Sequence, residues 1–266
     1  MMNEANSNLP DTEEAAKQMS VTAMPGTALI TGGARRIGKE IAETLHSAGY
    51  NIMIHHRSST GAAQSLVDEL NSIRPDSAAA TRFDLLDLES IPKIIDATIE
   101  QFGQLSVLVN NASTFYPTPI ELINDEFWND LMGSNLKAPA FLVKSAAPHL
   151  RKSGGSIVNI IDIYAQKPLS NHPIYCAAKA GLEMLTKSLA RDLAPEIRVN
   201  GVSPGAILWP EKGNTEISQV ELIERVPLHR MGTPSDIAVT VKFLVQDASY
   251  ITGQIIAVDG GRSIVI

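Results

Sequence analysis

Short apolar runs alternate with longer segments in which apolar residues recur at helical spacing. The segments predicted as strands are 28–30, 51–55, 79–83, 107–109, 156–161, 197–202 and 255–258. The segments predicted as helices are 37–48, a polar stretch ending near residue 70, 91–102, 126–149, 176–190 and 234–245. A broken loop is predicted between the last two helices, from Pro204 to about Gln219. The chain therefore reads as a regular alternation of strands and helices.

This alternation predicts an α/β fold. The strand–helix unit recurs about every 25 to 30 residues, which is typical of parallel strands joined by right-handed helical crossovers. Segments 108–109 and 157–161 are almost continuously apolar, as expected for strands buried on both faces of a sheet. Since no linker or repeat divides the pattern, we predict one doubly wound parallel sheet in a single domain over residues 25–266. Residues 1–24 are polar and acidic, and predict a disordered N-terminal tail.

Composition narrows the class of protein. The 266 residues are 44% hydrophobic and 19% charged, as in an ordinary globular protein. The net charge of −7 argues against a nucleic-acid partner, and no apolar run is long enough to predict a membrane span. The single cysteine, Cys176, has no partner for an internal disulfide, which favours a reducing compartment. We therefore expect a cytoplasmic enzyme or binding protein.

The first predicted strand leads into a glycine-rich turn, residues 31–38. Gly32 and Gly38 would let the backbone approach a pyrophosphate at the start of the following helix. Ile37, the first residue of that predicted helix, is a further candidate contact of the cofactor. Arg36 stands where a further glycine is usual and adds a cation. The alternative is a plain tight turn. The glycine-rich turn follows the first strand of an alternating chain, and this position favours binding of a dinucleotide cofactor over a plain turn.

The ends of the next three strands supply further candidate cofactor contacts. The second strand is followed by His56, Arg57 and Ser58, where a fold selective for NADH would place a carboxylate. A cation and a hydroxyl suit a 2′-phosphate, so we predict NADPH, the alternative being that Arg57 is an ordinary surface residue. After the third and fourth strands come residues that could contact adenine or let the backbone run close to the cofactor: Asp84, Leu85, Asn111, Ala112 and Ser113.

Tyr175 and Lys179 are four residues apart, so they share one face of the helix predicted at 176–190. An ammonium beside a phenol favours the phenolate and lowers the pKa of the tyrosine, as proton transfer near neutral pH requires. Taken alone, the pair is better explained by an ordinary amphipathic helix with a half-buried tyrosine and a surface lysine. The strand-end residues favour the catalytic interpretation.

Taken together, these motifs resemble the short-chain dehydrogenase/reductase family over about residues 27–262. They comprise the turn Thr31-Gly32-x-x-x-Arg36-x-Gly38, Asn110-Asn111-Ala112, Asn135, Tyr175-x-x-x-Lys179 and Asn200-x-x-x-Pro204-Gly205. The resemblance implies a Rossmann-type fold, a nicotinamide cofactor contacted also by Pro204 and Gly205, and a catalytic Tyr–Lys pair with Asn135 in a proton relay. It also implies, commonly, a homotetramer, with the turn at 259–261 near subunit contacts.

One position departs from the common family pattern. Most members carry a serine thirteen residues before the tyrosine, where it hydrogen-bonds a substrate carbonyl, and this chain has Asp162 there. An ionised carboxylate could hold a polar N–H group of a substrate, and a buried protonated one could pass a proton to the phenol. The change suggests a nitrogen heterocycle as substrate.

The departures together are similar to the pteridine reductase branch of the family. By that resemblance Phe115 stacks on a pterin, Ser113 contacts pterin and cofactor phosphate, and Arg36 bridges the two. Asp162, Tyr175 and Lys179 would deliver the proton while NADPH delivers a hydride to a ring C=N bond. The substrate would be a dihydropteridine, a dihydrofolate or an oxidised pterin.

Several alternatives stand beside this interpretation. Phe115 could be a hydrophobic plug, and Trp209 could either line the substrate pocket or simply pack. His172 is expected in an exposed loop, and Arg262 is expected in solvent unless the chain end reaches a neighbouring site. No cluster of metal-ligating residues is apparent around Cys176. The alternative functions are a carbonyl reductase of 3-oxoacyl thioesters and a non-catalytic NADPH-binding regulator.

Overall fold

A single seven-stranded parallel sheet forms the centre of the computed structural model, which describes residues 26–208 and 219–265. The strand order is β3-β2-β1-β4-β5-β6-β7. The strands are β1 Thr27–Ile30, β2 Asn51–His56, β3 Ala78–Arg82, β4 Val107–Asn110, β5 Ser156–Ile160, β6 Arg198–Pro204 and β7 Ile255–Val258. The predicted doubly wound Rossmann-type fold is confirmed. The predicted tail at 1–24 and Trp209 lie outside the described residues.

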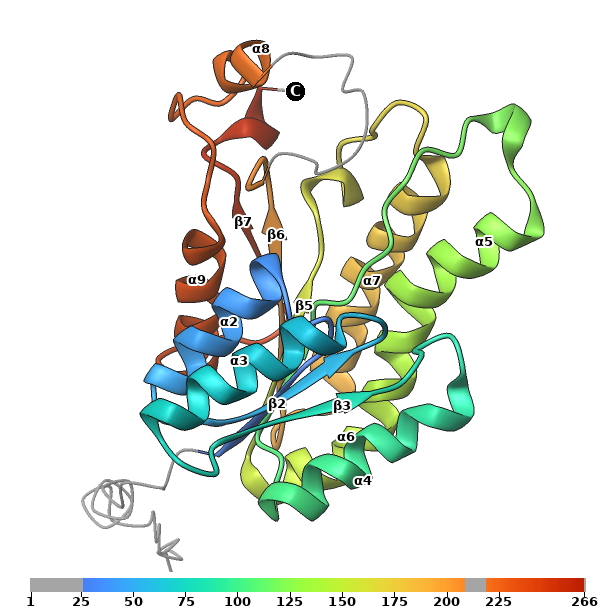
Figure 1. The fold of residues 1–266 in the computed structure, drawn as a ribbon. Coiled ribbons are helices and arrows are strands. Elements are labelled where there is room, and N and C mark those ends of the chain that lie inside the picture. The colour runs from blue at the N-terminus through green and yellow to red at the C-terminus, as the bar shows by residue number, and fades with distance from the viewer. Residues whose placement is uncertain (1–25, 209–218, 266) are drawn as a thin grey trace, which may run out of the picture.

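Helices cover both faces of the sheet (Figure 1). One face carries α2 Arg36–Ser47, α3 Thr60–Ile73 and α9 Pro234–Gln246; the other carries α4 Ile91–Phe102, α6 Ala138–Ser153 and α7 Pro173–Asp192. Two shorter helices, α5 Asp125–Met132 and α8 Gln219–Glu224, lie outside these layers. No described helix is long and apolar enough to cross a membrane.

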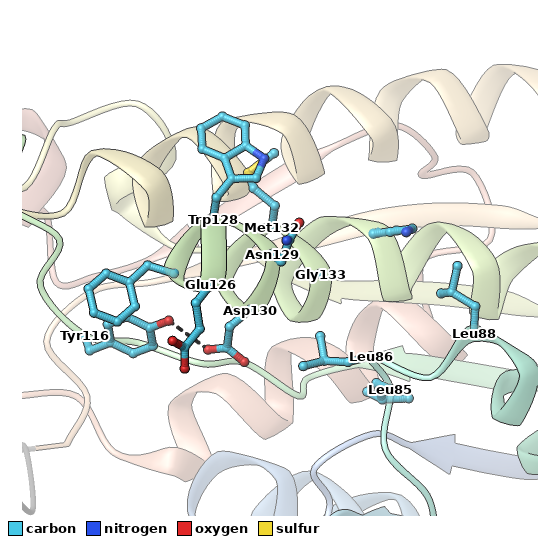
Figure 2. A pocket seen from close by; sticks show the side chains of 12 residues that line it. Leu85, Leu86, Leu88, Tyr116, Glu126, Trp128, Asn129, Asp130, Met132 and Gly133 are labelled. Atoms are coloured by element: carbon cyan, nitrogen blue, oxygen red, sulfur yellow. Dashed lines mark hydrogen bonds between the residues drawn. The ribbon is translucent and has the colours of Figure 1, made fainter. Parts of the chain in front are cut away.

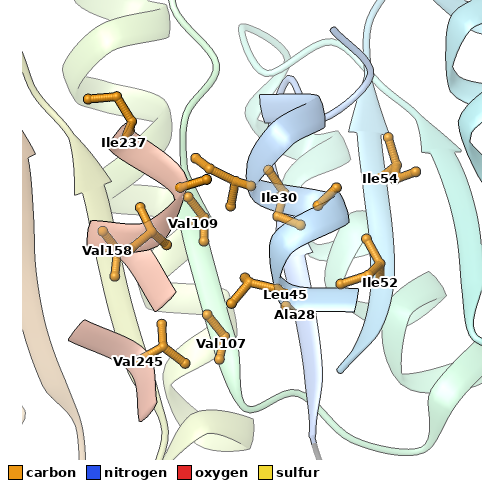
Figure 3. Packing of buried hydrophobic residues seen from close by; sticks show 14 of the residues in the cluster. Ala28, Ile30, Leu45, Ile52, Ile54, Val107, Val109, Val158, Ile237 and Val245 are labelled. Carbon is orange, nitrogen blue, oxygen red and sulfur yellow. The ribbon is translucent and has the colours of Figure 1, made fainter. Parts of the chain in front are cut away.

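The apolar core is divided by the sheet into two main layers. Side chains of β1, β2, β4 and β5 pack against α2 and α9 on one side (Figure 3). Ile30, Val109 and Val158 belong to that layer, whereas the neighbouring Leu29, Leu108 and Ile157 belong to the opposite one. Successive residues of a strand point to opposite faces, so central strands covered on both faces are mainly apolar at consecutive positions. This is why the strands read as continuous apolar runs.

The helix predicted at 126–149 is interrupted in the structure. A π-helical turn, η3 Gly133–Lys137, separates α5 from α6 and contains Asn135. The Asn135 side-chain amide donates to the Leu131 carbonyl at 3.0 Å, which is the acceptor that the main-chain N–H of residue 135 would use in an α-helix. The continuous helix prediction is wrong here because a side chain competes for a backbone acceptor, which hydrophobic periodicity does not report.

A buried chain of polar groups ties α7 to the centre of the sheet. Asn110 Nδ2 donates to Asn159 Oδ1 at 2.8 Å, and Asn159 Nδ2 donates to Thr186 Oγ1 at 2.8 Å. Thr186 in turn donates to the Leu182 carbonyl at 2.7 Å. Asn159 and Thr186 are fully buried, so each group depends on its partner within the protein. The chain joins β4, β5 and the helix that carries Tyr175 and Lys179.

Replacing Thr186 by Val should lower the free energy of unfolding by about 1–3 kcal/mol, because the Asn159 amide then loses its buried acceptor. Equilibrium urea denaturation measures this. Thr98→Val is the matched control: Thr98 is equally buried, but its hydroxyl bonds only to the Ile94 carbonyl of its own helix. Equal losses in the two variants would show that the polar chain contributes nothing specific.

Candidate active site

The glycine-rich turn after β1 is held against the end of β4. Thr31 Oγ1 accepts hydrogen bonds from the main-chain N–H groups of Asn111 and Ala112, at 2.9 and 3.0 Å. Asn111 Nδ2 donates to the carbonyls of Thr31 and Gly32, at 2.9 and 3.1 Å. Of the predicted cofactor residues, Asn111, Ala112 and the turn around Gly32 are therefore brought together.

This turn has no room for larger side chains. Gly32 has a positive φ of 60°, and a Cβ added there would lie 3.0 Å from the Ala112 Cα. A Cβ on Gly38 would lie 2.6 Å from Asn111 Nδ2 and would also meet the Gly32 carbonyl. The first turn of α2 carries no acidic residue and no side-chain cap. The turn thus offers close backbone approach and a helix N-terminus, which suit the pyrophosphate of a dinucleotide.

The ends of β2 and β3 lie beside this turn. His56 is the last residue of β2 and is buried, whereas Arg57 and Ser58 behind it are exposed. The end of β2 thus presents a cation and no carboxylate, as predicted from the sequence. Asp84 and Leu85 follow β3, where an Asp84 carboxylate oxygen accepts from the Leu86 N–H at 3.0 Å.

His55 is a residue of this region that the sequence did not single out. Its Nδ1 accepts from the Gly32 N–H at 3.4 Å, so its Nε2 carries the proton and donates to the Phe83 carbonyl at 3.1 Å. Burial lowers the pKa of His55 to about 4, and the ring stays neutral. Through these two hydrogen bonds, His55 links the glycine-rich turn to the end of β3. Its place at the end of β2, beside the glycines, is the one signal that could have identified it.

A second cluster lies where β5 meets α7. The Tyr175 hydroxyl donates to Asp162 Oδ2 at 2.8 Å, and the Tyr164 N–H donates to Asp162 Oδ1 at 2.9 Å. Lys179 Nζ donates to the Ile160 carbonyl at 2.9 Å and lies 5.7 Å from the centroid of the Tyr175 ring. The structure thus brings Tyr175 and Lys179 together, as their spacing predicts, and places Asp162 beside Tyr175, as the family resemblance implies.

Burial dominates the electrostatics of this cluster. Burial raises the pKa of the Tyr175 phenol well above its usual value, and the charge of Asp162 raises it further. Burial also raises the pKa of Asp162, opposed chiefly by its hydrogen bonds from Tyr164 and Tyr175, and lowers the pKa of Lys179 to about 8. The expected lowering of the Tyr175 pKa by Lys179 is not found. Burial raises this pKa, the Lys179 ammonium donates to the Ile160 carbonyl, and the Tyr175 hydroxyl donates to the Asp162 carboxylate.

Asn135 and Ser113 extend the cluster. The Ser113 hydroxyl donates to Asn135 Oδ1 at 2.6 Å. Burial raises the pKa of the Tyr175 phenol, and the nearby Ser113 hydroxyl opposes that rise slightly. Asn135 is buried, and its amide also donates to the Thr114 carbonyl at 3.0 Å. The π-helical turn therefore fixes the loop after β4 beside the tyrosine.

Phe115 lies over this cluster. Its ring stacks on His172 with centroids 4.7 Å apart, and its edge meets Tyr175 at 4.8 Å. Phe115 is 51% exposed, so it is not a buried plug. His172 is half-buried against it, so the expectation of an exposed loop histidine is wrong. The expectation that Arg262 is in solvent is also wrong, since only 8% of this residue is exposed.

Pro204 and Gly205 close the site at the end of β6. Pro204 is buried, and the Gly205 N–H donates to the Val258 carbonyl at 3.1 Å. A Cβ on Gly205 would lie 2.7 Å from the Asp259 Cα, so this position also requires a glycine. Both residues lie at the carboxyl edge of the sheet with the other predicted cofactor contacts.

A cavity of about 840 Å³ lies elsewhere, beside α5 (Figure 2). It is lined by residues such as Leu85, Trp128 and Met132, and by Tyr116, whose hydroxyl donates to Asp130 at 3.0 Å. None of Asp162, Tyr175 and Lys179 lines it. The cavity therefore lies next to the cluster of Asp162, Tyr175 and Lys179 and not within it, since its lining residues Tyr116, Phe127 and Met132 pack in one apolar cluster with Tyr175. The described residues also contain no group of three or more histidine, cysteine or acidic side chains able to hold a metal ion.

Comparison with known proteins agrees with this geometry. Residues 32–263 match a family model described as enoyl-(acyl carrier protein) reductase. The chain is 36% identical to pteridine reductase 1 of Leishmania tarentolae, with 92% of this chain and 99% of that protein covered. It is also 36% identical to a 3-oxoacyl-[acyl-carrier-protein] reductase of Staphylococcus aureus, with 90% and 98% covered. The chain belongs to the short-chain dehydrogenase/reductase family and is an oxidoreductase of that family.

Proposed function

We propose that this protein is an NADPH-dependent reductase of pterin-like substrates, namely dihydropteridines, dihydrofolates or oxidised pterins. One observation carries the proposal. Asp162 occupies the position at which most members of the family have a serine, and its carboxylate accepts the hydrogen bond of the Tyr175 hydroxyl. A carboxylate there offers no hydroxyl to a substrate carbonyl, but it can accept from the N–H groups of a nitrogen heterocycle.

Tyr175 is the proposed proton donor. Its raised pKa keeps the phenol protonated at neutral pH, and the hydrogen bond to Asp162 fixes its orientation. Proton transfer to a ring nitrogen would leave a phenolate. Lys179, whose Nζ lies 5.7 Å from the centroid of the Tyr175 ring and donates to the Ile160 carbonyl, is the cation proposed to offset that charge during the reaction. The buried Asn135 positions Ser113 beside the same phenol. A bound nicotinamide supplies the hydride to the C=N bond.

The residues at the sheet edge fit the cofactor. Arg57 and Ser58, with the buried His56, suit a 2′-phosphate, and His56 Nδ1 has no hydrogen-bond partner among the described residues. The remaining proposed cofactor contacts are Gly32, Arg36, Ile37, Gly38, Asp84, Leu85, Asn111, Ala112, Ser113, Tyr175, Lys179, Pro204 and Gly205.

The exposed ring of Phe115 is the proposed stacking surface for the substrate. It lies edge-on to Tyr175, so a planar bicycle stacked on it would lie next to the proton donor. Arg36 and Ser113 are the proposed polar contacts of the pterin. Arg36 is the exposed first residue of α2, at the carboxyl edge of the sheet.

We also propose that the protein is a cytoplasmic homotetramer, as the family resemblance implies. Exposed apolar side chains on one part of the surface support subunit contacts there: Val239 and Phe243 of α9, and Tyr250 just beyond it.

The second candidate is a reductase of 3-oxoacyl thioesters. The chain is 36% identical both to the staphylococcal 3-oxoacyl reductase and to the pteridine reductase. Overall similarity therefore favours the two candidates equally. Asp162 favours the pterin, because the carbonyl of a thioester substrate needs a hydrogen-bond donor at that position.

NADPH oxidation should be faster with dihydrobiopterin or dihydrofolate than with an acetoacetyl thioester, and Tyr175→Phe should reduce it by about two or more orders of magnitude. Steady-state absorbance at the nicotinamide band measures both. A preference for the thioester would establish the second candidate. Turnover of either substrate class would exclude the third alternative, a non-catalytic NADPH-binding regulator.

Asp162→Ser should reduce pterin turnover at least about tenfold, because the substrate N–H groups and the Tyr175 hydroxyl lose their shared acceptor. The dissociation constant of NADPH, measured by fluorescence titration, should stay nearly unchanged. Asp87→Ser provides the control, since Asp87 caps the turn at Leu88–Ser90. Full pterin turnover in Asp162→Ser would refute the assigned role.

Arg57→Asp should weaken NADPH binding by about tenfold or more and favour NADH relatively, because a carboxylate repels the 2′-phosphate. The ratio of kcat/KM for the two cofactors measures the change. Arg151→Asp makes the same charge change in an exposed residue of the last turn of α6. If both substitutions alter the ratio equally, Arg57 does not contact the phosphate.

A further inference from the structure

Arg262 is a buried cation at the end of the chain, beside the proton-donating cluster. It begins the short helix η5 Arg262–Ile264, directly after two glycines with positive φ. The Asp259 carboxylate shapes this turn by accepting from the N–H groups of Gly261 and Ser263, at 2.9 and 2.7 Å. The carboxylate of Asp259 is thereby occupied by groups of its own turn, which also include the Ser263 side chain. Arg262 has no ion pair with an acidic side chain within 4 Å in the described part of the chain.

Tyr164 connects Arg262 to Asp162. The Arg262 guanidinium carbon lies 5.7 Å from the centroid of the Tyr164 ring, and the main-chain N–H of Tyr164 donates to Asp162 Oδ1. Tyr164 belongs to the turn η4 Ile163–Ala165, so one residue carries both contacts. Arg262 Nε is buried and finds no hydrogen-bond partner among the described residues. A desolvated cation is costly unless nearby negative charge offsets it, and Asp162, which shares Tyr164 as a neighbour, is close enough for the charge of Arg262 to lower its pKa.

We infer that Arg262 is a positioning residue for Asp162, acting through Tyr164 and through its charge to keep the carboxylate ionised as the acceptor of the Tyr175 hydroxyl. The site then holds two buried cations around one carboxylate, with Lys179 on α7 and Arg262 on η5. The catalytic part of this inference rests on the proposed function. The electrostatic part concerns this chain's residues alone.

The groups that act on Asp162 come from three elements: Tyr164 from η4, Tyr175 and Lys179 from α7, and Arg262 from η5. Cys176 of α7 acts on Tyr164 and Tyr175. Burial raises the pKa of Asp162, and the two cations oppose that rise. A buried acid of this kind contributes stability that is lost as the pH rises through its folded-state pKa. Removing Arg262 raises that pKa further. Ionised Asp162 then costs more stability at neutral pH than in the unaltered protein.

A double-mutant cycle tests the electrostatic part without any substrate. The loss of Tm caused by Arg262→Gln should grow between about pH 5 and about pH 8, and Arg262→Lys should restore much of it. In an Asp162→Asn background the same loss should be independent of pH over that range. A loss that is equal at every pH in both backgrounds would make Arg262 merely structural and overturn the inference.

The pH profile of kcat/KM with a dihydropterin tests the catalytic part. Arg262→Gln should shift the acid limb to higher pH by roughly half a unit or more, with KM for NADPH unchanged, since ionised Asp162 is needed and now forms at higher pH. Arg191→Gln, an exposed arginine in the last turn of α7, is the control and should leave the limb in place. An unmoved limb in Arg262→Gln would refute the inference. If the wild-type protein reduces no pterin, the proposed function fails, whereas the stability cycle still decides the role of Arg262.

Discussion

The reversal of strand order between β1 and β4 is the constraint on which the site depends. The chain leaves β1 toward one face of the sheet and leaves β4 toward the other, so the two loops diverge and a crevice forms between them. Thr31 and Asn111 hold the sides of that crevice together by four hydrogen bonds. Because all strands are parallel, the ends of β2, β3, β5 and β6 reach the same edge. Residues far apart in the sequence therefore share one site.

Desolvation gives this site its chemical character. Three ionisable side chains, Asp162, Tyr175 and Lys179, lie together where burial disfavours the charged form of each. Each charge is then sensitive to its immediate neighbours, more than it would be in water. A single change from a hydroxyl to a carboxylate at position 162 alters both the hydrogen-bonding and the charge of the cluster. This is why our proposal on the substrate class depends on residue 162, and not on overall identity.

The fold could be predicted from the sequence because the type and order of its elements follow from local patterns of apolar and polar residues. Strands buried on both faces must be apolar without interruption, and amphipathic helices must repeat with helical spacing, so element types and order follow from periodicity. The gathering of Asp162, Tyr175 and Lys179 was also predictable, since it needs only one strand end and one helix face. The roles of these residues remain predictions.

What the sequence did not predict depends on contacts between distant segments. The interruption at Asn135 arises because one side chain takes a backbone acceptor, and the pattern of apolar residues is unaffected by it. The burial of Arg262 requires the chain end to fold against Tyr164, which no local signal reports. The position of His55 beneath the glycine turn likewise follows from the pairing of β1 with β2. Trp209 lies outside the described residues.

The π-helical turn at Gly133–Lys137 also works as a phase shift along one continuous helical segment. An extra residue in a turn rotates everything beyond it by roughly 100° relative to an uninterrupted α-helix. Upstream, Leu131 of α5 packs with Ile174 and Tyr175 beside the site, whereas downstream Leu142 of α6 packs in the core under the sheet. Because of this rotation, the apolar face of α5 packs beside Tyr175, whereas the apolar face of α6 packs against the sheet. Substitutions in α5 can therefore alter the packing around Tyr175 while the packing of α6 against the sheet stays as it is.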